Sequence, residues 1–313
     1  MEAAIAEKDA QIAELEQALK KKPVDLVPIT EKLLALQELL KSGAPLHTVS
    51  VKKTDEYGNP YFEDVQVYPN LSLSVQDRET GMVYQWEVGK AYESGEFVRM
   101  IYALALLECA TEEQAALENS NQGGTLTYDL TARYTLMPED LQGGSGILQN
   151  ETAGKVYTYL DLIEILLSYN DSIAYQILLR RFEDRPMAVF LTKVEAFAGR
   201  DSLDKLTASD LTVILDRMQA LIDSDSPYAT RLKNALTSAV ATYYSQASTT
   251  ATAVGRYHSL TATGHHEIAI RYDDTHAMTV VLLTDITVVT PEWGAYLISL
   301  YQSLNDLMLA FRA

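Results

Sequence analysis

The chain has 313 residues, of which 47% are hydrophobic and 22% are charged, so it can bury a large core. Its formal net charge of -18 at pH 7 argues against nucleic acid or an anionic membrane surface as a partner, because both would repel the chain. The single cysteine, Cys109, excludes an internal disulfide and a thiolate metal cluster. The sequence given contains neither a signal-peptide pattern nor an apolar run of about 18 residues, so no transmembrane helix is predicted in it.

Residues 1–44 are predicted to form a helical stalk ahead of a domain that spans residues 45–313. The first 22 residues are rich in alanine, glutamate and lysine, and apolar residues recur seven positions apart at Ile5, Ile12 and Leu19. This short heptad pattern favours a homo-oligomer formed through residues 1–22. A second amphipathic helix is predicted over Ile29–Lys41. The alternative for this second helix is that it packs on the domain.

Strand patterns occur near both ends of the domain. Two hairpins are predicted early and one late, as follows: His47–Lys53 with Phe62–Tyr68, Leu71–Asp77 with Met82–Val88, and His266–Tyr272 with Met278–Asp285. The early hairpins lead into a strongly apolar segment, Tyr92–Glu108, which is expected to form a buried helix that begins with two charged residues, Glu96 and Arg99.

Helical patterns fill the middle of the chain and its end. They cover Glu112–Asn119, Leu160–Leu179, Met187–Phe197, Thr207–Leu221, Pro227–Ala241 and Trp293–Phe311. Thr158 and Thr207 stand where helix-capping residues are preferred. Strands at both ends and helices between them predict an α+β fold, in which the late strands complete the sheet begun by the early ones.

Several local signatures follow one another in an order that resembles a known family. They are the hairpin with Asp77-Arg-Glu-Thr-Gly81, the segment Gly143-Gly-Ser-Gly-Ile-Leu148, the run Leu167-Ser-Tyr-Asn-Asp-Ser-Ile-Ala174, Thr207-Ala-Ser-Asp210, and the last hairpin. Together they resemble the class A β-lactamases and the transpeptidase and carboxypeptidase domains of penicillin-binding proteins. The resemblance implies an antiparallel sheet packed with helices, and a mainly helical subdomain over about residues 108–245.

The residues that carry the chemistry of the resembled family are altered. That family uses a serine nucleophile at the start of the buried helix and a lysine one turn later. Aligned on the helix, these positions hold Glu96 and Arg99. Glutamate is a poor acylation nucleophile in this setting, and arginine keeps its proton and cannot act as a base. Glu96 and Arg99 are instead expected to form an ion pair that fills the site, with Ser168 and Asn170 as hydrogen-bond partners.

The two remaining motifs of the resembled family are partly kept. In place of Ser-Asp-Asn the chain has Ser168-Tyr169-Asn170, whose outer residues still offer a hydroxyl and a carboxamide, unless they are ordinary capping residues. The Lys-Thr-Gly motif of the edge strand would fall at Arg256-Tyr257-His258. Arg256 would keep the cation, whereas the bulk of Tyr257 and His258 is expected to obstruct the groove beside the strand.

No deacylating glutamate, cofactor loop or metal site is predicted. Between Asn170 and Thr207 the helices leave little room for the loop that carries this glutamate in class A enzymes. Four histidines close in the sequence, His258, His265, His266 and His276, lack the spacing of a helical zinc motif, and strand alternation points His265 and His266 to opposite faces. No Gly-x-Gly-x-x-Gly or Walker motif is present, so no nucleotide cofactor is expected.

These residues favour a catalytically inactive relative of the resembled family. It would act as a binding or scaffolding module outside the cytoplasm near the cell wall, with a cell-wall peptide or glycan, or another protein, as its partner. One alternative is an active serine-hydrolase-type or β-lactam-hydrolysing enzyme with a rearranged site, for instance Glu96 acting as a base with His258. Another is a coiled-coil adaptor that depends on residues 1–22.

Overall fold

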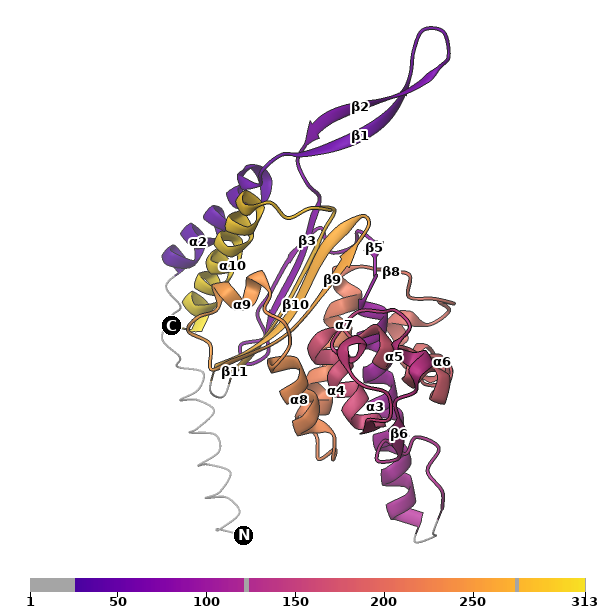
Figure 1. Cartoon of the computed structure of the whole chain (residues 1–313). Coiled ribbons are helices and arrows are strands. Elements are labelled where there is room, and N and C mark those ends of the chain that lie inside the picture. The colour runs from indigo at the N-terminus through magenta and orange to yellow at the C-terminus, as the bar shows by residue number, and fades with distance from the viewer. Residues whose placement is uncertain (1–25, 121–123, 274–275, 313) are drawn as a thin grey trace, which may run out of the picture.

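A five-stranded antiparallel sheet forms the centre of the molecule (Figure 1). The computed structural model describes residues 26–120, 124–273 and 276–312. The strand order is β4-β3-β11-β10-β9, and the strands are β3 (Leu71–Asp77), β4 (Val83–Trp86), β9 (Ala253–Thr261), β10 (Gly264–Asp273) and β11 (His276–Thr284). The early strand β3 pairs with the late strand β11, which confirms the α+β layout predicted from the sequence.

Helices cover both faces of this sheet. One face carries α2 (Leu26–Glu38), the π-helical turn η1 (Leu39–Gly43), α9 (Tyr243–Ala247) and α10 (Pro291–Arg312). The other carries α3 (Phe97–Ser120), α4 (Tyr159–Tyr169), α5 (Ser172–Phe182), α6 (Arg185–Lys193), α7 (Ala208–Ile222) and α8 (Ala229–Thr237). Strand β11 shows the division, because Val280 and Leu282 pack toward α10 while Val281 and Leu283 pack toward the helices on the opposite face.

The remaining elements are short. Strand β5 (Tyr92–Glu93) pairs with β8 (Lys205–Leu206), and β6 (Arg133–Thr135) pairs with β7 (Val156–Thr158). Three 3-10 turns complete the chain, namely η2 (Pro138–Leu141), η3 (Leu148–Asn150) and η4 (Glu195–Phe197).

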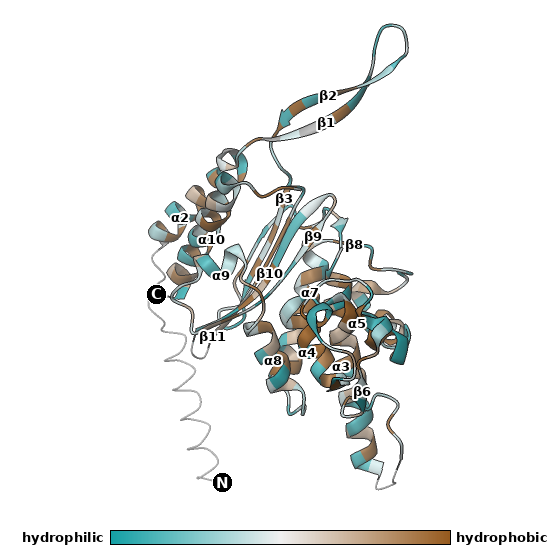
Figure 2. Ribbon diagram, viewed as in Figure 1, coloured by the Kyte–Doolittle hydropathy of each residue, from teal (hydrophilic) through white to brown (hydrophobic). Residues whose placement is uncertain are grey.

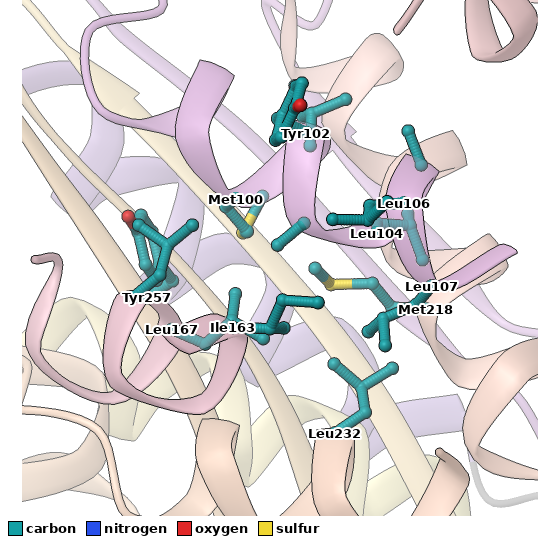
Figure 3. Close-up of a cluster of buried hydrophobic side chains, with 14 of the residues drawn as sticks. Met100, Tyr102, Leu104, Leu106, Leu107, Ile163, Leu167, Met218, Leu232 and Tyr257 are labelled. Atoms are coloured by element: carbon teal, nitrogen blue, oxygen red, sulfur yellow. The ribbon is translucent and has the colours of Figure 1, made fainter. Parts of the chain in front are cut away.

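Helix α3 lies at the centre of the larger core. Its first four turns are buried on nearly all sides, and Met100, Leu104 and Leu107 face side chains from α4, α7 and α8 (Figure 3). In Figure 2 the apolar colour likewise concentrates on these packed helices. The helix begins at Phe97 and continues to Ser120, so the two separate segments expected at Tyr92–Glu108 and Glu112–Asn119 form one helix. Within the described ranges, no helix is both long and apolar enough to cross a membrane.

The long helix expected over Leu160–Leu179 is instead two helices. Asn170 ends α4 in the left-handed conformation with φ of 50°, and Asp171 caps α5. The Asp171 carboxylate accepts the backbone N–H groups of Ile173 and Ala174, both at 2.9 Å, which are donors that the first turn of a helix leaves free. The turn therefore directs Asn170 away from the axis of α4 and toward the start of α3.

Residues 26–44 pack on the domain, so the expectation of a stalk over residues 1–44 is wrong for this part. Helix α2 lies along α10 (Figure 1), and Ile29, Leu36 and Leu40 are buried in the core between α10 and the sheet. The hydroxyl of Tyr296 on α10 also donates to the carbonyl of Leu39 at 3.0 Å. The physical reason is that the leucine stripe of α2 is needed to cover α10. The heptad pattern in residues 1–22 lies outside the described residues.

The first predicted hairpin is present but does not join the central sheet. Strands β1 (His47–Thr54) and β2 (Pro60–Val67) pair with each other in a separate two-stranded ribbon that projects from the body (Figure 1). Tyr57 and Phe62 on this ribbon are exposed. The hairpins β3–β4 and β10–β11 are formed as predicted, and they are the ones that build the sheet.

Candidate active site

The start of α3 is held directly against strand β9. Gly95 turns the chain with φ of +51°, and a Cβ added there would lie 2.5 Å from Ser259 Oγ, so only glycine fits this approach. The backbone N–H of Glu96 donates to Ser259 Oγ at 2.8 Å, and the Ser259 hydroxyl donates to the Ser94 carbonyl at 3.1 Å. Ser259 therefore ties the helix start to the edge strand of the sheet.

The Glu96 side chain folds back onto the same strand. The backbone N–H of Leu260 donates to Glu96 Oε2 at 3.1 Å. Glu96 is half-buried, and one of its two carboxylate oxygens accepts from this strand donor. The described residues show no hydrogen bond between Glu96 and His258, which the alternative of a rearranged active site would require.

Arg99 interacts with the turn between α4 and α5. Its Nη1 donates to both the backbone carbonyl and Oδ1 of Asn170, each at 3.3 Å. Among the described ion pairs there is none between Arg99 and Glu96, so the expected pair is not formed, because each side chain bonds a different neighbouring segment. Ser168 is not a partner either, since it is buried and donates to the Ala235 carbonyl at 3.1 Å.

Tyr257 closes the space between these groups. Its hydroxyl donates to Asn170 Oδ1 at 2.7 Å and lies 3.4 Å from the Glu96 carbonyl oxygen. Burial, followed by the nearby negative charge of Glu96, raises the pKa of Tyr257, so the hydroxyl keeps its proton. Figure 3 places this ring beside Met100 and Leu167, at the edge of the apolar core.

Arg256 and His258 flank Tyr257 on β9 and lie on the other side of the strand. The Arg256 guanidinium donates to the backbone carbonyls of Thr237 at 3.0 Å and Val240 at 3.1 Å. It is thereby held away from Glu96. His258 lines a separate cavity, and burial lowers its pKa, so the imidazole is neutral at pH 7.

A model of the β-lactamase enzyme family matches residues 66–296, which is more than half of the chain. The chain belongs to the β-lactamase enzyme family. No curated protein matches it.

Solved structures similar to this β-lactamase-family chain show the same fold. A β-lactamase from Sphaerobacter thermophilus is 12% identical, with a TM-score of 0.62 over 93% of this chain and 99% of that one. A structure of PBP-A is 11% identical, with a TM-score of 0.62 over 90% and 96%. An ancestral class A β-lactamase is 18% identical, with a TM-score of 0.59 over 76% and 94%. The resemblance to class A β-lactamases and penicillin-binding proteins inferred from the sequence is confirmed.

The structure favours a counterpart of the family's second motif that lies two residues later than expected. Its Ser-Asp-Asn pattern has a carboxylate at the centre, and here the carboxylate in the turn is Asp171, flanked by Asn170 and Ser172. The Gly143–Leu148 segment is clamped to this turn, because Leu148 N–H donates to Asp171 Oδ2 and Ser145 N–H donates to Ser172 Oγ, both at 2.8 Å. Gly146 is required there, since an added Cβ would lie 2.3 Å from Asp171 Oδ2.

The third motif also differs from the expectation, by one residue. The strand positions that face α3 and the Asn170 turn are Tyr257 and Ser259, so the structure favours Tyr257-His258-Ser259 as the counterpart of Lys-Thr-Gly over Arg256-Tyr257-His258. Moving the motif by one residue along a strand places its side chains on the opposite face of the sheet. With this alignment, the Tyr257 phenol stands where the family's motif has a cation beside the second motif.

The adjacent histidines of β10 point to opposite faces of the sheet, as predicted. The His265 ring contacts Tyr243 of α9, with centroids 5.8 Å apart, whereas the His266 ring stacks on Phe97 of α3 at 6.1 Å. In the part of the chain that the structure describes, no three histidine, cysteine, aspartate or glutamate residues are placed to hold a metal ion.

His266 is buried and neutral in the folded state. Thr284 N–H donates to its Nδ1 at 3.2 Å, and its Nε2 then carries the proton that is donated to the Glu93 carbonyl at 3.1 Å. Burial is the main cause that lowers the pKa of His266 from 6.5 to about 4. A protonated ring would place an N–H group against the Thr284 donor.

Acidification is therefore expected to destabilise the fold through His266. Because the unfolded state binds the proton near pH 6.5 and the folded state only near pH 4, stability is full above pH 6.5 and falls as the pH drops. Between pH 6.5 and about pH 5 the loss should be about 2 kcal/mol. Urea unfolding across this window should show a shallower pH slope for His266→Phe than for the wild type, and equal slopes would contradict this assignment.

Proposed function

We propose that this β-lactamase-family chain is a binding module that does not acylate with β-lactams. The observation that carries the proposal is that the chain's own atoms occupy the donors around Glu96. Acyl transfer needs backbone N–H groups free to stabilise the developing oxyanion. Here Glu96 N–H is bonded to Ser259 Oγ and Leu260 N–H is bonded to the Glu96 carboxylate.

The side chains at the site support the same proposal. Arg99 cannot accept the proton of a nucleophile, and its guanidinium is engaged by Asn170. The Tyr257 hydroxyl lies between Asn170 and the Glu96 carbonyl, where a substrate would have to enter. Nucleophile, base and open donor sites are thus all replaced, and losing any one of them costs orders of magnitude in rate.

The proposed setting is outside the cytoplasm, near the cell wall, where members of the family often work. The proposed partner is a cell-wall peptide or glycan, or another protein. The net charge of -18 supports a neutral or cationic partner over nucleic acid. Homo-oligomerisation through residues 1–22 is part of the same proposal, and sedimentation of the full chain against a chain lacking these residues would test it.

The decisive test is covalent labelling. The wild-type chain is expected to show no stoichiometric label with a fluorescent penicillin and no turnover of a chromogenic cephalosporin, with a known class A β-lactamase as the positive control. A label on any serine of the wild type would overturn the proposal.

The double variant Glu96→Ser with Arg99→Lys is also expected to remain unlabelled. It restores the nucleophile and the base, but Tyr257 still occupies the space beside Asn170. Adding Tyr257→Gly to this pair separates the effect of the blocking phenol from the effect of the missing nucleophile and base. The triple variant lacks the phenol and keeps the restored motif. Labelling of the double variant itself would refute the claim that Tyr257 blocks the site.

A further inference from the structure

A cavity of about 460 Å³ lies on the face of β9 opposite Tyr257. It is formed where β9 and β10 meet the chain around α9 and the segment before α10. His258 and Leu260 come from β9, and His265 and Glu267 come from β10. The volume is in the range of small-molecule sites.

The rim of this cavity is apolar. Val240, Leu260 and Val288 come from three segments far apart in the sequence, and each has about half or more of its surface exposed. Single exposed aliphatic residues are common, but three that converge on one cavity favour contact with the apolar part of a ligand.

The floor is polar, but the Glu267 carboxylate already accepts from the backbone N–H groups of Tyr243 and Tyr244, both at 3.0 Å, so His258 is the side chain that offers a ligand an acceptor. His265 Nε2 lies 3.0 Å from Glu267 Oε1, which fixes the Nε2 proton toward the carboxylate. The Nδ1 atom of His265 is buried and has no hydrogen-bond partner among the described residues. His258 lines the same cavity as a neutral imidazole, and in the described part of the chain its ring makes no hydrogen bond.

The charges at the cavity are negative. Glu267 is buried at the floor, and Glu96 is close enough to influence His258 across the strand. The described residues that line the cavity include no lysine or arginine. Arg256, two positions before His258 on the same face of β9, does not line the cavity, and its guanidinium donates to the backbone carbonyls of Thr237 and Val240.

We propose that this cavity binds a small molecule that carries an amine on an apolar body. The amine would donate to His258 and lie in the negative field of Glu267, and the apolar body would contact Val240, Leu260 and Val288. An anionic ligand of the same shape is disfavoured, because no lysine or arginine is among the described residues that line the cavity and could pair with it. This inference deepens the binding role proposed above and rests on it.

Two probes of matched shape test the charge preference. Titration of the isotope-labelled full chain with 2-phenylethylamine is expected to give saturable NMR shifts at Leu260, Thr242 and Val289, with a dissociation constant of about 1 mM or tighter. The acid 3-phenylpropanoate should give no saturable shifts at these amides. Equal or tighter binding of the acid, or no saturable binding of the amine, would overturn the proposal.

Two variants locate the site. Val288→Lys places a cation at the exposed rim and should weaken amine binding by about fivefold or more, whereas Val83→Lys, at another exposed valine on β4, should not change it. His258→Phe keeps a ring but removes both nitrogens, and the preference for amine over acid should fall. Unchanged affinity in Val288→Lys, with an unfolding midpoint like that of the wild type, would place any binding elsewhere.

Failure of this proposal is distinguishable from failure of the proposed function. Penicillin labelling reports on the Glu96 side of β9, and amine binding reports on the cavity on the other side. If the chain neither binds the amine nor is labelled, only the proposed class of ligand is refuted. If the wild type is labelled by penicillin, the proposed non-enzymatic role is itself refuted.

Discussion

Replacing Asp171 by alanine is expected to lower the free energy of unfolding by about 4 kcal/mol, because three backbone donors lose their acceptor at once. Asp171 is fully buried, with an exposed fraction of 0%. Its Oδ1 accepts from Ile173 and Ala174 N–H, and its Oδ2 accepts from Leu148 N–H at 2.8 Å. Alanine would leave these groups unpaired in a site closed to water.

Urea unfolding of Asp171→Ala and Asp171→Asn, followed by circular dichroism, measures this effect. Asparagine keeps an oxygen for the α5 donors but turns its amide toward Leu148 N–H, so its loss should be smaller. Asp55→Ala is a matched control, since Asp55 also accepts two backbone N–H groups but does so in the solvated turn of the β1–β2 ribbon. If Asp171→Ala unfolds like Asp55→Ala, the carboxylate does not hold the Asn170 turn.

Replacing Leu36 by alanine is expected to cost about 3 kcal/mol, because it empties a fully packed position between α2, α10 and the sheet. Leu36 has an exposed fraction of 0%, whereas Leu34, on the same helix, is 60% exposed. Leu34→Ala should therefore change the free energy of unfolding by no more than about 0.5 kcal/mol. Denaturant unfolding of the two variants compares the buried and exposed faces of α2 directly. Equal stabilities would mean that α2 is a dispensable spacer after all.

The fold could be predicted to a large extent because its signals are local. The central hairpins combine alternating apolar residues with turn residues, such as Asp77 and Gly81, and both hairpins are present. The helix starts at Thr158 and Thr207 were also readable, because a capping box needs only residues three positions apart. The docking of α2 was not readable, since an amphipathic helix shows that it has an apolar face but not what covers that face.

The site could be predicted only in part, because its geometry depends on offsets of one or two residues. Glu96 and Arg99 stand at the helix start as expected, but their partners come from β9 and from the α4–α5 turn. The apolar pattern runs through Asn170 without interruption, which hid the break between the two helices. Asp171 followed by Ser172 was the available signal, since aspartate is a preferred capping residue. On β9, only the structure shows that Tyr257 and not Arg256 faces the site.

Because β3 pairs with β11, the central sheet joins two segments that are separated by most of the length of the chain. Asn70, next to β3, donates its backbone N–H to Asp285, 215 positions later, at 2.8 Å. Bringing together residues this distant in sequence costs loop-closure entropy. This cost arises before the contacts can stabilise the fold. During synthesis, the early hairpin β3–β4 cannot pair with β11 until nearly all of the chain has been made. Leu73 and Val75 therefore stay exposed to solvent until then. The helices from α3 to α8 are expected to assemble first, and completion of the sheet is expected to limit the folding rate.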